Sequence, residues 1–203
     1  MKRIGIAALI ASTIGPVQSI LGWVISGALW PGYDPIRKTI SDLAADDSSV
    51  QAIQTSFFFL GATLTVIGAI SARTLALPGR LTLLLAGIAT YALAIFTTPS
   101  QDGHSDAHRI AASISFVLIS AWPLLSMRLD RRYPWVVRPA AAIGATLGLT
   151  LISIWFLMTW LDPNTAVVGL SERVIVTSQV LWLSFTVWTC WLIERYAETK
   201  ARV

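Results

Sequence analysis

Long apolar blocks separated by short polar stretches make up most of this 203-residue chain. Each block approaches the roughly 20 residues that an α-helix needs to cross a bilayer. The pattern predicts six membrane-spanning helices, at about 5–29, 51–72, 80–98, 108–127, 139–161 and 174–193. We therefore expect an all-α membrane protein, a six-transmembrane-helix bundle that forms a single transmembrane domain over residues 1–203.

The composition agrees with this class and excludes a soluble enzyme. Hydrophobic residues make up 55% of the chain and charged residues 13%, whereas a soluble domain has about 45–50% and 25%. Too few charges remain to cover a globular surface. The formal net charge is +4, which would suggest nucleic acid as the partner of a soluble protein. In a membrane protein the excess reflects orientation, so the bilayer is the expected partner and nucleic acid is not.

The positions of the basic residues predict that both termini are cytoplasmic. With the spans above, eleven of the 15 Lys and Arg residues fall on the side of the termini and four on the other side. Short loops that are rich in Lys and Arg remain in the cytoplasm. Eight of the 11 acidic residues fall on the outer side. Because acidic residues contribute little to orientation, we interpret this bias as a sign that the outer face uses its carboxylates for another purpose.

A turn and a short amphipathic helix are predicted after the first span. Proline and glycine residues at 31–35 favour a turn. Ile36, Ile40 and Leu43 then recur at spacings of four and three, which places them on one face of a helix lying against the bundle or the membrane surface. Ser41 and Asp42 lie on this helix. Either residue has a second interpretation as a cap of a local helix end, and for Asp42 both remain open.

The third loop holds both histidines of the protein. His104 and His108 are four residues apart, with Asp102 close by, and such side chains suit Zn²⁺ or another divalent ion. Gly103 argues against a helix at His104, and the alternative is a solvated acidic loop, so we predict no metal site. His108 opens the fourth span, where it is expected to point into the outer end of the bundle and to transfer protons.

Arg173, near the start of the last span, needs a separate explanation. A cation in the first turn of a helix opposes the helix dipole. We therefore expect Arg173 either to pair with a carboxylate, Asp42 or Asp102, or to bind an anionic group.

Several short motifs on the outer side resemble those of a known family. They are Gly-Tyr-x-Pro and Ser-(Glu/Asp)-Leu after the first span, a Phe-Pro-x-Asp-like turn, a histidine opening the fourth span, and Gly-Leu-x-x-Arg before the last span. The matching residues are Gly32, Tyr33 and Pro35; Ser41, Asp42 and Leu43; Phe96, Pro99 and Asp102; His108; and Gly169, Leu170 and Arg173.

On these motifs the chain resembles, over nearly its whole length, the bacterial and archaeal integral membrane proteins catalogued as domain of unknown function 998. The resemblance implies a multi-pass protein of a bacterial or archaeal plasma membrane and implies no activity. The chain departs from the motifs at Thr97 and Thr98, which separate Phe96 from Pro99. His104 has no counterpart.

Two functions from different classes fit these residues. The first is an intramembrane enzyme that acts on a lipid or isoprenoid by acid/base chemistry, with Asp42, His108 and Ser41 as catalytic residues. The residues expected to bind its substrate are Arg173, Tyr33 and Asp102. The second is a non-catalytic lipid-binding, carrier or envelope-assembly protein. The sequence contains no phosphate-binding motif, cofactor fingerprint or HExxH zinc motif, so it names no cofactor.

The expected geometry of the site distinguishes the enzyme from the non-catalytic protein. Asp42, His108 and Arg173 lie at the outer ends of different predicted elements, where helix ends of one bundle come close together. We expect them to line one polar pocket open to the outer leaflet, with Ser41 at its rim. Convergence on an apolar cavity would favour the enzyme, and side chains splayed into water would favour the second function.

Overall fold

The computed structural model describes residues 3–101, 103 and 105–201, and all of its regular structure is helical. The elements in chain order are α1 (Ile6–Leu29), α2 (Ile40–Leu43), α3 (Gln51–Ser71), α4 (Leu77–Ile95), α5 (Asp106–Leu125), the 3₁₀ turn η1 (Trp135–Val137), α6 (Pro139–Leu161) and α7 (Val168–Lys200). Six of these helices are long and apolar enough to cross a membrane. The predicted all-helical architecture with six long apolar helices is therefore confirmed.

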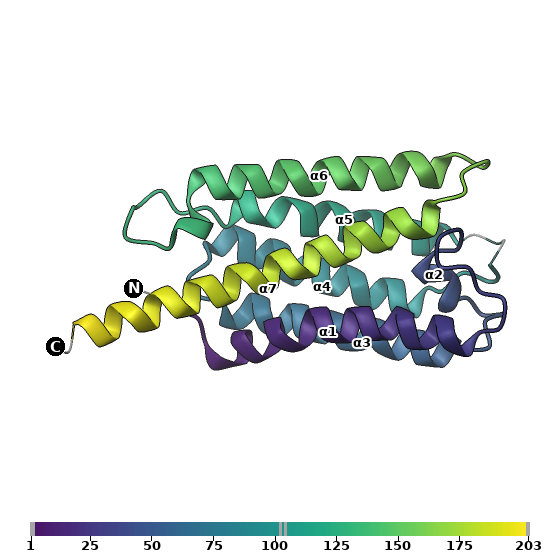
Figure 1. Cartoon of the computed structure of the whole chain (residues 1–203), viewed down its shortest axis with the longest axis horizontal. Helices are drawn as coiled ribbons and strands as arrows, with labels where there is room; N and C mark the ends of the chain where they lie inside the picture. The colour runs from purple at the N-terminus through teal and green to yellow at the C-terminus, as the bar shows by residue number, and fades with distance from the viewer. Residues whose placement is uncertain (1–2, 102, 104, 202–203) are drawn as a thin grey trace.

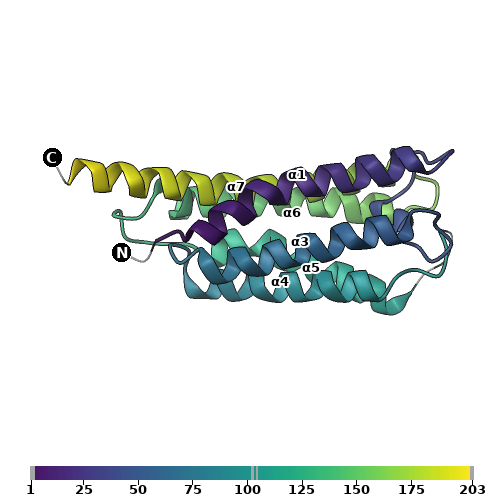
Figure 2. The ribbon, with the colours of Figure 1, turned by 90° about the horizontal axis from the view of Figure 1, so that it is seen from below.

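The largest boundary difference lies in the last span, which was expected at 174–193 and is observed from Val168 to Lys200. Hydropathy detects only the apolar middle of this helix, whereas backbone hydrogen bonding continues through the polar turns at both ends. The 33 residues of α7 correspond to about 50 Å at 1.5 Å per residue, well beyond the ~30 Å hydrocarbon core. Its last turns project past the neighbouring helices (Figure 1, Figure 2).

The six spans close into a ring. Each long helix packs mainly against the next one in the chain, and α1 packs against α7. Both termini lie at one end of the ring, and α2 lies with the loops at the other end (Figure 1). Close packing depends on small residues: a Cβ added to Gly87 of α4 would lie 2.8 Å from Cγ2 of Val66 on α3. Such close approach is typical of membrane helices.

The α6 helix is the least buried span. Its buried residues are Ala142 and Leu149, and it packs against α5 on one side and α7 on the other. The side chain of Gln179 on α7 hydrogen bonds across to α5, through the Phe116 carbonyl oxygen at 3.3 Å and Ser120 Oγ at 3.2 Å. The α6 helix thus covers the outside of a contact between α5 and α7.

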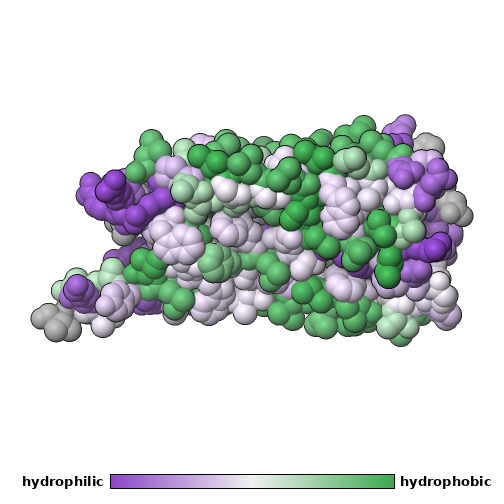
Figure 3. Space-filling view, turned by 45° about the horizontal axis from the view of Figure 1, so that its top comes forward, coloured by the Kyte–Doolittle hydropathy of each residue, from purple (hydrophilic) through white to green (hydrophobic). Residues whose placement is uncertain are grey.

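The outer surface suits a lipid environment. Large apolar side chains such as Ile10, Leu85 and Leu151 are exposed along the helices. On the face shown in Figure 3, hydrophobic and near-neutral residues make up the middle of the molecule, and the most hydrophilic ones gather at its two ends. An apolar surface of this extent is unfavourable in water and matches the hydrocarbon of a bilayer.

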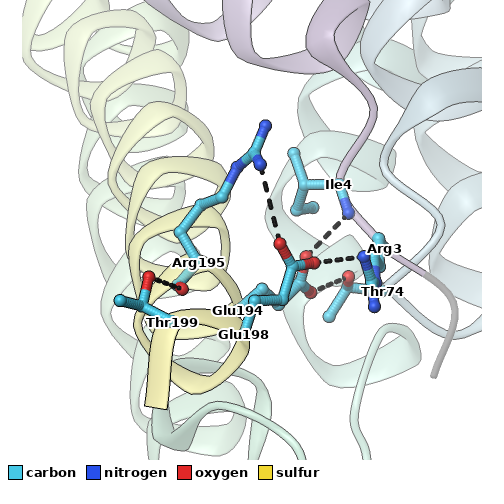
Figure 4. Close-up of polar contacts among 7 residues, drawn as sticks. All are labelled: Arg3, Ile4, Thr74, Glu194, Arg195, Glu198 and Thr199. Atoms are coloured by element: carbon cyan, nitrogen blue, oxygen red, sulfur yellow. Dashed lines mark hydrogen bonds and ion pairs between the residues drawn. The ribbon is translucent and has the colours of Figure 1, made fainter. Parts of the chain in front are cut away.

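The end that carries the termini is fixed by a buried carboxylate. Glu194 of α7 accepts hydrogen bonds from the Ile4 backbone N–H at 3.0 Å and from the Thr74 hydroxyl (Figure 4). Arg128 donates to the Thr74 and Leu75 carbonyl oxygens, each at 3.0 Å. These contacts tie the segment before α1 and the α3–α4 connection to α7, so this end is a structural anchor.

The segment after α1 contains a helix shorter than the predicted apolar spacing suggested. The α2 helix spans only Ile40–Leu43. Ile40 and Leu43 are buried, whereas Ile36 lies before the helix with half of its surface exposed. The two buried side chains hold α2, and with it Ser41 and Asp42, against the end of the bundle opposite the termini.

Candidate functional site

The site begins with a turn that reverses the chain after α1. Pro31 is followed by Gly32, whose φ of +79° favours glycine. The Tyr33 N–H donates to the Trp30 carbonyl oxygen at 3.1 Å, which closes the turn. The turn places the Tyr33 hydroxyl 2.5 Å from Nη2 of Arg173 and 2.6 Å from the Thr39 carbonyl oxygen, so Tyr33 bridges α7 and the segment leading to α2.

The first turns of α7 hold this segment in place. A Cβ on Gly169 would overlap the Lys38 carbonyl oxygen, so only glycine permits this close approach. The Leu170 N–H donates to the Ile36 carbonyl oxygen at 3.0 Å. The Gly-Leu-x-x-Arg motif therefore packs directly on the residues that follow the Gly-Tyr-x-Pro motif.

Arg173 has partners that the sequence did not indicate. Its Nη1 donates to the carbonyl oxygens of Lys38 at 3.0 Å and Gly169 at 2.9 Å. Its guanidinium also lies over the rings of Trp23, at 5.2 Å, and Tyr33, at 5.6 Å. Among the described residues its hydrogen-bond partners are neutral oxygens, so the expected carboxylate partner is not among them. The reason is that α7 begins five residues before Arg173, so the helix-dipole argument for its first turn does not apply.

Tyr33 is held as a neutral hydrogen-bonding group. Burial raises the pKa of its phenol, although the neighbouring Arg173 guanidinium acts in the opposite direction. The protonated hydroxyl can therefore donate to the Thr39 carbonyl oxygen while it accepts from Arg173.

Glu172 is a site residue that the sequence analysis missed. Its side chain is buried, and Oε2 accepts a hydrogen bond from the Ile40 N–H at the start of α2. The available signal was the spacing of Gly169, Glu172 and Arg173, which places all three on one face of a helix.

Ser41 and His108 form a hydrogen-bonded pair. Nε2 of His108 lies 3.1 Å from Ser41 Oγ, and Nδ1 lies 2.8 Å from the Phe96 carbonyl oxygen at the end of α4. A carbonyl oxygen only accepts, so in the neutral ring Nδ1 carries the hydrogen and Nε2 accepts from the Ser41 hydroxyl. The arrangement is that of a nucleophile, a base and a group that orients the base.

His108 is positioned from both of its sides. Its backbone N–H donates to Oγ of Ser105, which caps the start of α5, at 3.3 Å. Its side chain is 5% exposed. The expected place of His108, at the start of the fourth span and pointing into the end of the bundle, corresponds to what is observed.

Asp42 lies next to this pair and has a capping role. Its Oδ2 accepts from the Thr39 N–H at 2.7 Å, and its own N–H donates to Thr39 Oγ1 at 3.1 Å. This reciprocal arrangement is a capping box. The capping alternative for Asp42 is therefore realised, and it fixes the helical turn that carries Ser41.

Two positions of the third loop that the sequence singled out, Asp102 and His104, lie outside the described residues. Within the described part of the chain, no group of three or more His, Cys, Asp and Glu side chains could hold a metal ion. The roles predicted for Asp102 stay predictions.

A large crevice lies between α5 and α6 and opens at the end that carries α2. It has a volume of about 920 Å³, and we call it the α5–α6 crevice. Charged and polar side chains line the α2 end, and mostly apolar and small ones line the rest, down to Ala121 and Thr146. At the α2 end these include Lys38, Ser41, Asp42, His108 and Arg109, and farther along Phe116, Val117, Ile154 and Leu157.

A second, smaller space of about 160 Å³ lies inside the ring, and we call it the inner cavity. Its lining comes from α1, α2, α3, α4, α5 and α7. Ser41, Phe116 and Glu172 line both spaces. Ser41 therefore lies where the α5–α6 crevice and the inner cavity adjoin.

The expected convergence is realised for two of its three members. Asp42 and His108 both line the α5–α6 crevice, with Ser41 between them. Arg173 and Tyr33 line neither of these two spaces. They support the segment that leads into α2, and the substrate-binding roles predicted for them stay predictions.

Comparisons with known proteins give one match. The model of the family described as "Protein of unknown function (DUF998)" matches residues 13–189. This confirms the resemblance found from the motifs. No curated protein and no solved structure matches the chain.

Proposed function

This chain belongs to the DUF998 family, and we propose, from the geometry of its site, that it is an intramembrane enzyme that cleaves or transfers the acyl group of a lipid ester. The hydrogen bond between Ser41 Oγ and His108 Nε2 carries this proposal. A half-buried hydroxyl whose proton faces an oriented, neutral imidazole is the arrangement that makes serine a nucleophile.

The two side chains divide the chemistry of the first step. Ser41 Oγ forms a bond to the ester carbonyl carbon while its proton passes to His108 Nε2. The tetrahedral intermediate then breaks the bond to the leaving alcohol, which takes the proton from Nε2, and an acyl-serine remains. The Phe96 carbonyl oxygen holds the Nδ1 hydrogen and stabilises the imidazolium as an aspartate does in a serine hydrolase triad, though with less charge.

The shape of the α5–α6 crevice favours an amphiphile as substrate. Its α2 end is lined by the cations Lys38 and Arg109 as well as by Ser41 and His108. Its walls toward the middle of the bundle carry no charged side chain and combine apolar residues with serines and threonines. Val117 and Leu157, which line it, are 65% and 46% exposed on the lateral surface. A lipid can therefore enter sideways from the bilayer, with its ester beside Ser41 and an acyl chain along α5 and α6.

A substitution series tests the proposal. Purified protein in liposomes is incubated with lipid esters of different chain lengths, and the released products are measured together with labelling by a fluorophosphonate, which reacts with activated serines. We expect Ser41→Ala and His108→Ala to lower turnover by about 10²-fold or more, and Ser41→Ala to abolish labelling. Ser113→Ala, at another serine of the same crevice, should behave as wild type. Equal turnover in wild type and Ser41→Ala would refute the enzyme.

The second candidate is a non-catalytic lipid-binding or carrier protein. It is favoured by the same crevice, because a cavity open along its length can hold a lipid without changing it. It predicts that wild type and Ser41→Ala retain equal amounts of co-purified lipid and release no product. Turnover that depends on Ser41 distinguishes the enzyme from this alternative.

A further inference from the structure

The inner cavity has a mostly apolar lining, to which several polar side chains in the middle of the bundle also contribute. Its hydrogen-bonding side chains include Gln18, Gln54, Gln179, Ser12, Thr65, Thr90, Ser115 and Ser184. Polar groups within a membrane are expensive and face an interior space or one another. Some are paired here: Thr90 Oγ1 lies 3.0 Å from Ser115 Oγ, and Gln179 bonds to α5.

Three atoms of this lining have no hydrogen-bond partner among the described residues. They are Oε1 of Gln18, Oε1 of Gln54 and Nε1 of Trp23. The two glutamines are 8% and 2% exposed, so bulk solvent does not satisfy them. Leaving buried polar atoms unsatisfied is costly, and native proteins satisfy nearly all of them. A molecule in the cavity that both donates and accepts hydrogen bonds would satisfy these atoms.

The size of the space limits that ligand. A volume of about 160 Å³ holds a few water molecules or a small organic molecule, since one water needs about 10–15 Å³ on this measure. Glutamine carbonyl oxygens and the Glu172 carboxylate accept, and the Trp23 N–H donates. A hydroxyl group meets both requirements, whereas an anion would face the carboxylate of Glu172.

We infer that the inner cavity binds the acyl acceptor of the reaction, a small neutral molecule with a hydroxyl group: water or a short alcohol. This inference rests on the proposed function. The lipid ester occupies the α5–α6 crevice, and the acceptor approaches Ser41 from the inner cavity, which shares Ser41, Phe116 and Glu172 with the crevice.

In the second step the acceptor oxygen bonds to the acyl carbon of the acyl-serine while its proton passes to His108 Nε2. The bond to Ser41 Oγ then breaks, and Oγ takes the proton back from Nε2. The product is a free acid when the acceptor is water and a new ester when it is an alcohol. Glu172, which lines the same cavity, accepts a hydrogen bond from a second O–H of the acceptor, either the other hydrogen of water or another hydroxyl of the alcohol, and so positions it.

The first test asks whether the inner cavity is hydrated, and it does not depend on activity. In a Cys190→Ala background, which removes the single cysteine, a cysteine replaces Gln54 in the cavity or Leu60 on the outward face of the same helix. Because a thiol ionises and reacts only where water reaches it, we expect aminoethyl methanethiosulfonate to modify Gln54→Cys about tenfold faster than Leu60→Cys. Equal rates would mean that small polar molecules do not reach the cavity from solvent, and would overturn the inference.

The second test asks whether the acceptor uses this cavity. Gln54→Leu removes an unpaired polar atom and fills similar volume, so it should fold normally. We expect acyl-serine to form on Ser41 at the wild-type rate, measured by its mass shift, and to be released about tenfold more slowly because the acceptor loses a hydrogen bond. Gln51→Leu, one turn earlier on the same helix and hydrogen bonded to Asp46, is the matched control and should release acyl-serine normally.

The outcomes separate the inference from the proposed function. Normal release in Gln54→Leu would overturn the acceptor site while Ser41 chemistry stands. Absence of any acyl-serine in wild type would refute the enzyme, and the labelling of Gln54→Cys would still decide whether the cavity is hydrated. Glycerol added to the assay distinguishes the two acceptors, since a glyceryl ester appears only when an alcohol is used and free acid alone indicates water.

Discussion

Arg173 shows how a buried charge is kept in this protein without a carboxylate partner among the described residues. It is 7% exposed, and its guanidinium is surrounded by the carbonyl oxygens of Lys38 and Gly169, the Tyr33 hydroxyl and two aromatic rings. The partial negative charges of these oxygens and ring faces take the place of the full negative charge that a carboxylate partner would supply. The cost of burying Arg173 is thus offset by the contacts that also fix the segment before Ser41.

The phenol of Tyr33 should therefore contribute to stability in a pH-dependent way. Tyr33→Phe leaves Nη2 of Arg173 without its hydroxyl partner, which we expect to lower the free energy of unfolding by about 1–3 kcal/mol near neutral pH. Burial raises the pKa of Tyr33, so the folded protein keeps the phenol protonated where the unfolded chain, with a pKa of about 10, loses it. The contribution of the Tyr33 phenol to the free energy of unfolding is therefore complete below pH 10 and is lost as the pH rises above that value.

Unfolding of wild type and Tyr33→Phe in detergent between pH 7 and about 11 measures this difference. The gap in the free energy of unfolding should be constant up to about pH 10 and then narrow. Other titrating groups are common to both proteins and cancel in the comparison. A gap that stays constant, or widens, above pH 10 would contradict the raised pKa.

At the scale of elements, the contact between the start of α7 and the segment before α2 decides where Ser41 lies. The backbone of Gly169 touches the carbonyl oxygens of Pro35 and Lys38 so closely that a methyl group has no room. We expect Gly169→Ala to push this segment away and to lower the free energy of unfolding by about 1–3 kcal/mol. Gly144→Ala on α6, where a Cβ meets nothing within 4 Å, should be neutral or slightly stabilising.

Thermal unfolding of both variants, together with turnover, checks this expectation. Because Ser41 depends on α2 for its position, Gly169→Ala should lose turnover together with stability. Wild-type stability in Gly169→Ala would show that the close approach at α7 is not required.

The helices and their contacts also show which features of this structure could be predicted from the sequence. The spans follow from apolar blocks because membrane insertion depends on local hydropathy. The sequence also predicts that Ser41 and His108 lie at the same end of the bundle, because an even number of spans separates them. The partners of Arg173 were not predictable in this way, since carbonyl oxygens of a distant segment leave no trace in the side-chain pattern. Glu172 was missed because a carboxylate near a helix start already had a local explanation.

At the scale of the whole molecule, the two ends of the ring differ in character. One end carries both termini (Figure 1) and is tied together by Glu194 (Figure 4) and by Arg128. The other end carries α2, the Ser41–His108 pair and the mouth of the α5–α6 crevice. The chemistry proposed here therefore belongs to a single side of the membrane, and its physiological meaning depends on which side that is.

The distribution of basic residues predicts that the α2 end faces outward. Most Lys and Arg residues lie at the end of the termini, and such loops remain in the cytoplasm. In a Cys190→Ala background, we expect single cysteines at the exposed positions Asp47 and Asn164 to react with an impermeant thiol reagent added to intact cells. A cysteine at Arg131, exposed at the opposite end, should react only after the cells are lysed, which also controls for its intrinsic reactivity. Labelling of intact cells at Arg131 alone would reverse the orientation, and Ser41 would then act on lipids of the cytoplasmic leaflet.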